Sequence, residues 1–137
     1  MGGAVLMGAA SERDQAVTLN LADAVTKELF EAILEKFDLD HGNAEFGEGD
    51  YVTVEAPNHA TCMVDIAHCK SVRDLVEAMA GEIVDFDSDE EFTNCWSAEF
   101  AEHNGFTPLS FIRGLEEDAR HFRRASREMK KLLKWGI

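Results

Sequence analysis

The stretch YVTVEAPNHATCMVDIA, residues 51–67, decides the fold class of this chain. Residues 51–55 are rich in β-branched and aromatic side chains, as strands are, and residues 61–67 form a second apolar run. Between them, residues 56–60 contain the Pro and Asn that are typical of a turn. The stretch therefore predicts an antiparallel β-hairpin, although the second run also fits a helix. With helices on either side, the predicted fold class is α+β.

Four helices are predicted around this hairpin. Apolar residues recur at three- and four-residue spacing, which is the period of an amphipathic helix. The segments that show this period are residues 21–37, 72–84, 88–103 and 108–134. We expect these helices to carry the core, packed with the small antiparallel hairpin.

Several predicted helix ends have residues that suit them. Asn20 is placed to cap the first helix and Ser71 the second. Ser88 and Glu91 have the S-x-x-E spacing of a capping box at the start of the third helix. Gly105 suits a left-handed cap at the end of the same helix.

The chain is predicted to form one domain, because 137 residues suffice for one hydrophobic core. Residues 1–14 are predicted to be disordered or irregular, and residues 15–21 to form a short strand. The globular domain is expected to span residues 15–137 and to end in a basic helix. The N-terminus lacks the charge and the apolar run of a signal peptide, and no segment is long enough for a membrane span. We therefore expect a cytoplasmic protein without membrane contacts.

Charge is distributed unevenly along the chain, which has a formal net charge of −14. From Arg113 onward there are 8 basic and 4 acidic residues, which gives +4. The rest of the chain has 5 basic and 23 acidic residues, which gives −18. The sequence thus predicts an acidic body with a basic C-terminal helix, and such an acidic surface favours a basic partner.

Carboxylates are concentrated in the stretch IVDFDSDEEFTNCWSAEF, residues 83–100, and no Lys or Arg occurs between Asp74 and Ile112. The D-x-D-x-D spacing resembles a calcium loop, but Glu90 and Trp96 stand where an EF-hand needs Gly and Glu. The acids are better explained as the start of a helix, where negative charge is favourable, and as a presented surface. The candidate partner-binding residues are Asp85, Asp87, Asp89, Glu90, Glu91, Glu99 and Glu102, with Glu45, Glu48 and Asp50 as a second patch.

Four potential zinc ligands, His59, Cys62, His68 and Cys69, lie within eleven residues. There is no C-x-x-C spacing. His68 and Cys69 are adjacent, and adjacent residues on a strand or a helix are poorly placed to bind the same tetrahedral zinc ion. With Cys95 there are three cysteines, an odd number without framework spacing, so reduced thiols are expected. No metal or cofactor is predicted, and a zinc-binding protein remains the weaker alternative.

No catalytic motif is present. The chain has no nucleophile elbow, P-loop or dinucleotide-binding glycine pattern. Cys95-Trp96 is similar to the nucleophile region of papain-like proteases, but the flanking glycines are missing and Cys95 is expected to be a buried core thiol. The carboxylates are too numerous to single out an acid–base pair. The chain is therefore predicted not to be an enzyme.

The predicted C-terminal helix has a heptad-like apolar seam with one polar break at Ser126. This seam either packs on the body or pairs with a second copy of the chain. Its basic residues are expected to have a structural role, either as cations near the C-terminal end of the helix or by pairing with acids of the body or of the same helix. A C-terminal interaction surface is the second interpretation. Direct binding of nucleic acid is not expected, because −18 charges elsewhere repel phosphates.

Part of the chain resembles a group of short acidic proteins found on mobile elements of gut bacteria. The resemblance rests on residues 86–91, Trp96, residues 104–105, residues 110–112, Leu115 and residues 118–119. It covers residues 72–133 and departs from the pattern around Asn94 and residues 99–103. It implies a phage or plasmid accessory setting and assigns no catalytic residue.

These observations together predict a non-enzymatic inhibitor. A fixed array of carboxylates can compete with nucleic acid for a basic groove, with fast and salt-sensitive association. We expect an anti-defence protein, specifically an anti-CRISPR protein that blocks the nucleic-acid-binding surface of a CRISPR or restriction effector. The first alternative is a homodimeric interaction module that pairs through the helix of residues 108–134.

Overall fold

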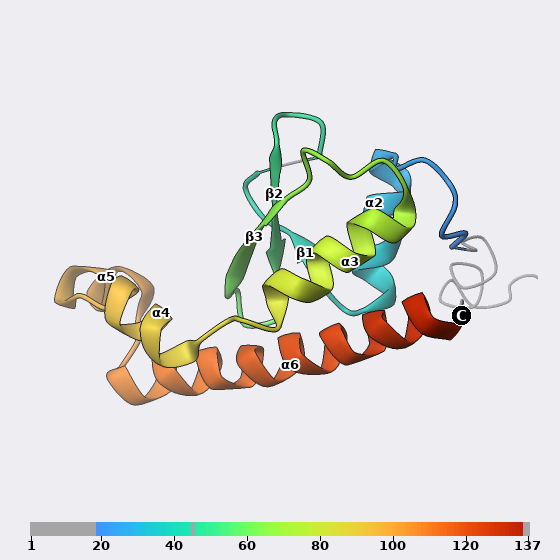
Figure 1. Cartoon of the computed structure of the whole chain (residues 1–137). Helices are drawn as coiled ribbons and strands as arrows, with labels where there is room; N and C mark the ends of the chain where they lie inside the picture. The colour runs from blue at the N-terminus through green and yellow to red at the C-terminus, as the bar shows by residue number, and fades with distance from the viewer. Residues whose placement is uncertain (1–18, 45, 136–137) are drawn as a thin grey trace, which may run out of the picture.

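The computed structural model describes residues 19–44 and 46–135 and has an α+β architecture, as predicted (Figure 1). Its strands are β1 (Asp40–His41), β2 (Tyr51–Glu55) and β3 (Thr61–Asp65). Its helices are α2 (Lys27–Lys36), α3 (Val72–Ile83), α4 (Ser88–Cys95), α5 (Ala98–Asn104) and α6 (Pro108–Trp135). The described residues thus hold five helices, one more than expected.

The three strands form one antiparallel sheet in the order β1-β2-β3, and the predicted hairpin of β2 and β3 is confirmed. Side chains alternate across the sheet, so that Val52, Val54 and Val64 are fully buried while Tyr51 and Met63 are exposed. The sheet therefore contributes one face to the core and presents the other to solvent.

A three-residue loop, residues 57–59, closes the hairpin. The backbone N–H of Ala56 donates to the carbonyl of Ala60, and that of His59 donates to the carbonyl of Ala56, both at 2.8 Å. His59 adopts a positive φ of 75°. A turn followed by one left-handed residue is a common way to close a hairpin, because it matches the twist of the strands.

Helix α3 lies at the centre of the core. It buries six residues, including Leu75, Met79 and Ile83, and contacts β3, α2 and α6. Ser71 caps it as predicted, through a capping box with Asp74. Its buried residues recur at three- and four-residue spacing, whereas Arg73, Glu77 and Glu82 are exposed, so α3 is an amphipathic helix with a wide apolar face.

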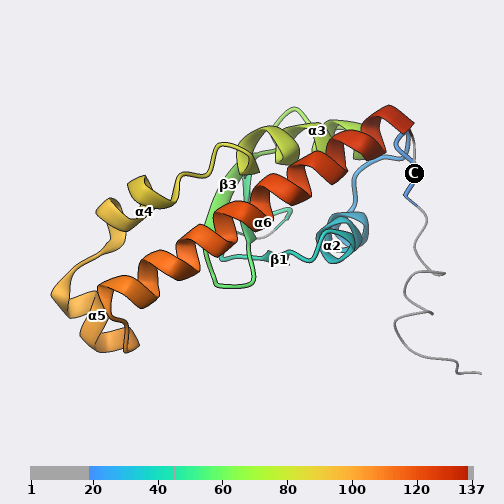
Figure 2. The ribbon, with the colours of Figure 1, turned by 90° about the horizontal axis from the view of Figure 1, so that it is seen from below.

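Helix α6 packs its apolar seam along α3 and extends beyond it at one end (Figures 1 and 2). Leu115, Phe122 and Met129 are buried on this seam, and the hydroxyl of Ser126 donates to the carbonyl of Ala80 at 2.9 Å. The polar break in the seam is therefore a buried hydrogen bond between α6 and α3. Because the chain's own core covers the seam, a second copy cannot pair with it in this fold.

The first predicted helix begins later than expected. The cap of α2 is Thr26, whose hydroxyl accepts from the N–H of Leu29 at 3.2 Å, whereas the Asn20 side chain accepts from Ala22 and closes a turn. Residues 21–25 instead run beside the start of α3, with hydrogen bonds such as that from Val72 N–H to Asp23 O at 2.8 Å. Pairing with a distant segment thus overrides the local helical period.

The predicted strand over residues 15–21 is not a strand where the structure describes it. Residues 19–21 lie in irregular structure and a turn, and residues 15–18 are outside the described part of the chain. The expectation for residues 1–14 falls outside it as well.

The third predicted helix, residues 88–103, is two helices. Asp87, not Ser88, caps α4, since its carboxylate accepts from the N–H groups of Asp89 at 2.9 Å and Glu90 at 3.2 Å. Trp96 then adopts an extended backbone, and the hydroxyl of Ser97 caps α5 by accepting from Phe100 N–H at 3.0 Å. The left-handed cap at Gly105, with φ 71°, is confirmed. The short polar side chain of Ser97 was the overlooked signal for the break.

A buried carboxylate joins the hairpin loop to α6. Asp118 is fully buried, and one of its oxygens accepts from the backbone N–H of Asn58 at 2.9 Å and from its amide group at 3.1 Å. The other oxygen accepts from the backbone N–H of Ala60 at 2.9 Å. These three donors compensate for the removal of the charge from water.

Replacing Asp118 with Ala should strongly destabilise the protein. The change leaves the part-buried donors of Asn58 and the buried N–H of Ala60 without an acceptor, which we expect to lower the free energy of unfolding by about 3 kcal/mol. Urea unfolding followed by circular dichroism measures this loss. Glu116→Ala is the control, because Glu116 is an exposed carboxylate on the same helix. Equal stability of the two variants would contradict a structural role for Asp118.

Cys62 should make the protein less stable at high pH. Burial raises the pKa of its thiol to about 12, with Glu82 and Glu91 adding to the effect, whereas an unfolded thiol ionises near 9.0. Between these values the folded state keeps a proton that the unfolded state has lost. The free energy of unfolding should therefore fall as pH rises through this window, by up to about 1.4 kcal/mol per pH unit.

Urea unfolding of the parent and of Cys62→Ala at about pH 8 and about pH 10.5 tests this linkage. The variant should lose less stability between the two pH values than the parent does. An identical loss in both proteins would show that the Cys62 thiol does not contribute to alkaline destabilisation.

Candidate functional site

Helices α4 and α5, with the first turns of α6, form a lobe at one end of the molecule, which we call the acidic lobe (residues 85–112). Figures 1 and 2 show both short helices beside the N-terminal end of α6, away from the sheet. None of the residues of α4 and α5 is fully buried. The lobe is thus a peripheral part of the fold.

Aromatic side chains hold the acidic lobe together. Phe92 lies on α4, Trp96 directly follows α4, and Phe100 lies on α5. Each of these rings packs against Phe111 of α6, with ring centroids 5.1–5.7 Å apart. Phe106 joins the cluster through Phe111 at 5.2 Å. Stacked and tilted rings at such distances stabilise one another beyond their burial. The apolar half of this stretch therefore fixes the two short helices on α6.

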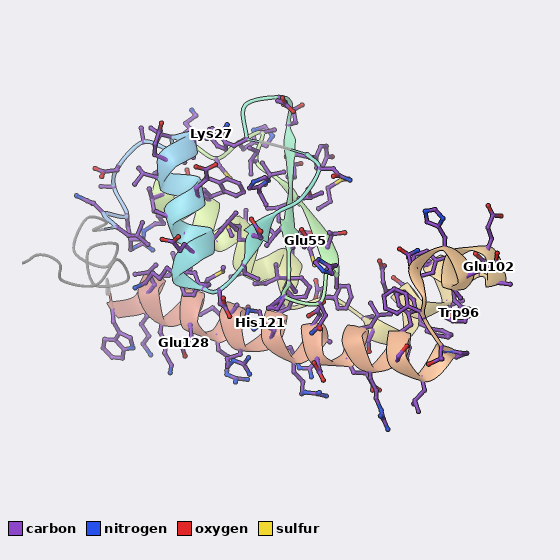
Figure 3. All side chains as sticks on the ribbon, turned by 180° about the vertical axis from the view of Figure 1, so that it is seen from behind. Lys27, Glu55, Trp96, Glu102, His121 and Glu128 are labelled. Atoms are coloured by element: carbon purple, nitrogen blue, oxygen red, sulfur yellow. The ribbon has the colours of Figure 1, made fainter. Side chains whose placement is uncertain are left out.

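All seven carboxylates predicted in this stretch lie on the acidic lobe. Asp85, Asp87, Asp89, Glu90, Glu99 and Glu102 are exposed and Glu91 is half-buried. Figure 3 shows Glu102 at the outer end of the lobe and Trp96 toward α6. Within the part of the chain that the structure describes, none of the seven forms an ion pair. The lobe thus presents uncompensated negative charge to solvent.

Two of these carboxylates also have local structural partners. Asp87 caps α4, as described above. Glu91 accepts a hydrogen bond from the thiol of Cys95 at 3.4 Å. Cys95 is exposed, so the prediction of a core thiol is wrong. Its helix turns the apolar face formed by Phe92 and Trp96 toward α6 and leaves Cys95 outside that face.

Large apolar side chains are exposed beside the carboxylates. Phe106 is 39% exposed and Leu109 57% exposed, and both lie where α5 ends and α6 begins. Neither residue belongs to the candidate contacts predicted from charge, although their position after the helix-ending Gly105 was a signal. Exposed aromatic and aliphatic groups with a polar surround are typical of a protein-binding surface.

The predicted second patch does not join the acidic lobe. Glu48 and Asp50 are exposed in the connection between β1 and β2, at the end of the sheet that is uppermost in Figure 1. Glu45 is outside the described residues. The nine predicted contact residues that the structure describes therefore do not form one surface.

The four potential zinc ligands do not converge. His59 lies in the hairpin loop with Cys62 near it, whereas His68 and Cys69 follow the opposite end of β3. His59 instead contacts the Glu55 carboxylate, with Nδ1 and Oε2 2.8 Å apart. Among the described residues, no group of three or more His, Cys, Asp or Glu side chains is arranged to hold a metal ion. The arrangement gives no support to the zinc alternative.

The basic residues of α6 do not pair with acids as expected. All eight are exposed, and among the described residues only Lys131 forms an ion pair, with Glu128 at 3.0 Å. The seam is buried, so the charged residues lie on the opposite face of the helix. The expected pairing is therefore limited to one ion pair among the described residues.

The comparisons with known proteins add no relative. The sequence matches no protein-family model and no curated protein, and the fold matches no solved structure.

In the described part of the chain, no helix combines the length and the apolar composition needed to cross a membrane.

Proposed function

We propose that this chain is a non-enzymatic cytoplasmic binding protein whose acidic lobe occupies the nucleic-acid-binding surface of a basic partner. The observation that carries the proposal is the set of seven unpaired carboxylates on one peripheral lobe that contains no Lys or Arg. The proposed partners are CRISPR or restriction effectors, so the protein would act as an anti-defence inhibitor of the anti-CRISPR type.

Charge supports this class of partner. A protein that holds nucleic acid presents Lys and Arg to the phosphates, and a fixed group of carboxylates can take the place of those phosphates. The aromatic cluster holds the carboxylates on short helices, which lowers the entropy lost on binding. Such a surface would associate rapidly and lose affinity as salt increases.

Apolar contacts support a protein partner in particular. Phe106 and Leu109 offer side chains that can enter a pocket, and buried aromatic anchors contribute much of the affinity of protein interfaces. A purely electrostatic surface would not need them. We expect these two residues to stand at the centre of the contact and the carboxylates to surround them.

The zinc-binding alternative and the homodimer alternative have less support than the acidic lobe. The potential zinc ligands do not converge, as described above. The apolar seam of α6 is buried against α3, so a homodimer through this helix would have to use its basic solvent face. A face of like charges opposes its own copy across a two-fold axis.

Neutralising three lobe carboxylates should abolish competition with nucleic acid. We choose Asp89→Asn, Glu90→Gln and Glu102→Gln, because the side chain of Asp87 is needed to cap α4. The readout is displacement of labelled guide RNA or target DNA from a panel of purified CRISPR and restriction effectors. The parent should displace nucleic acid from at least one effector, and the triple variant should do so at least about tenfold less well.

The matched control neutralises three exposed carboxylates elsewhere, Glu31→Gln, Glu77→Gln and Glu116→Gln, with the same change of net charge. It should displace nucleic acid as the parent does. If both triple variants lose activity equally, total charge rather than the lobe is responsible. Displacement that is unchanged in the lobe variant, with circular dichroism showing a folded protein, would refute the proposed surface.

A further inference from the structure

The solvent face of α6 carries an almost continuous row of cations, which we call the basic face. Its members are Arg113, Arg120, Arg123, Arg124, Arg127, Lys130, Lys131 and Lys134. Between residues 120 and 134, Glu128 is the only acidic residue among seven basic ones. The row lies opposite the seam formed by Phe122 and Met129, so α6 separates apolar and cationic surfaces.

The spacing of these cations is regular. Arg120, Arg123, Arg127, Lys131 and Lys134 follow one another at three or four residues, which places them on one side of the helix about 4.5 to 6 Å apart along its axis. The row from Arg120 to Lys134 is about 21 Å long. It is a straight ridge on a 28-residue helix that the core holds in place.

One position on the basic face is more than an exposed charge. Arg120, His121 and Arg124 line an open depression of about 260 Å³ against the hairpin loop. Its other lining residues are Pro57, Asn58, Glu117 and Asp118, and the carboxylate of Asp118 already accepts three hydrogen bonds from Asn58 and Ala60. His121 Nε2 lies 2.9 Å from the carbonyl of Asp38 and 3.2 Å from that of Phe37, so this nitrogen carries the proton and donates. Nδ1 of His121 is then the acceptor of the N–H from Arg124 at 3.2 Å.

This chain of contacts orients the guanidinium of Arg124. One of its N–H groups donates to His121, and among the described residues no acceptor is found for its other N–H groups. Arg124 also lines the depression. Figure 3 shows His121 on the side of α6 that faces the hairpin. A guanidinium held in a fixed orientation beside a second arginine suits bidentate binding of a phosphate.

We propose that the basic face of α6 binds the phosphate backbone of a nucleic acid, with one phosphate seated between Arg120 and Arg124. The proposal is independent of the acidic lobe, whose seven carboxylates lie before α6 begins. A membrane surface fits less well, because the apolar side of α6 is buried in the core and cannot enter lipid. Five of the eight cations are arginines, whose planar fork can bind two phosphate oxygens at once.

The negative charge of the rest of the chain limits this binding without preventing it. The Debye length is about 8 Å at physiological ionic strength, so acids on the far side of the body are screened from a ligand on α6. Contacts between arginine and phosphate at hydrogen-bond distance are screened much less. The net charge of −14 should therefore lower the affinity of the basic face relative to that of a basic protein with the same row.

Fluorescence anisotropy with labelled oligonucleotides of about 20 residues tests the proposal directly. The probes are single-stranded RNA, single-stranded DNA and duplex DNA, without any effector protein, so a failure here leaves the function proposed for the lobe untouched. The parent should bind at least one probe. Arg123→Glu with Arg127→Glu should weaken that binding at least about tenfold and reduce the slope of log affinity against log salt by about 2.

Two further variants separate the basic face from its alternatives. Lys36→Glu with Lys70→Glu changes the net charge by the same amount at exposed sites off α6 and should bind as the parent does. Arg124→Lys keeps the charge but loses the planar fork, and it should bind at least about threefold more weakly if a phosphate sits at the depression.

Three results would overturn the proposal. Equal weakening by the Lys36 and Lys70 pair would attribute the effect to net charge. If the parent binds polyglutamate but none of the oligonucleotides, the ligand of the basic face is an acidic protein rather than a nucleic acid. If Arg124→Lys binds oligonucleotides as the parent does, the proposed seating of a phosphate between Arg120 and Arg124 is wrong.

Discussion

The carboxylate of Asp118 is the interaction on which the arrangement of this fold depends. It lies on the buried side of α6 and takes three hydrogen bonds from the loop that closes β2 and β3. A buried charge is tolerated only where donors surround it, so the hairpin and the helix must meet at this register. The hairpin then places Val52, Val54 and Val64 against the core, and the hydroxyl of Ser126 fixes α6 on α3 at a second point. Apolar contacts supply the bulk of the stabilisation, whereas these two polar contacts select one alignment of the elements.

Fixing α6 in this way has two consequences for its surroundings. Its N-terminal end extends beyond α3 and offers Phe111 as the base of the aromatic cluster, so α4 and α5 have a place to pack outside the main core. Its solvent face cannot turn inward, because the seam is already buried. Seven of the eight cations on that face consequently lack an acidic partner among the described residues.

The molecule is therefore divided by charge as well as by structure. Carboxylates without cations gather on the acidic lobe, and cations with one acidic partner gather on α6. Such separation costs Coulomb energy that mixing would have recovered, and in a small protein it is most simply explained by partners of opposite charge. The function proposed for the acidic lobe and the binding proposed for the basic face would both bring the protein to complexes of protein with nucleic acid.

Sequence alone determined the elements whose signals are local. The alternation in β2 and β3, the Pro and Asn of the loop, and the long apolar period of α3 and α6 were sufficient to predict an α+β fold, because each reflects which side chains one face must bury. The candidate carboxylates were likewise evident from composition. The division of α4 from α5 was also marked locally, by Ser97. Only the tertiary structure decided the start of α2, the exposure of Cys95 and the lack, among the described residues, of acidic partners for most cations of the basic face. Each of these depends on which distant segment lies alongside, and the spacing of residues along one chain carries no record of such neighbours.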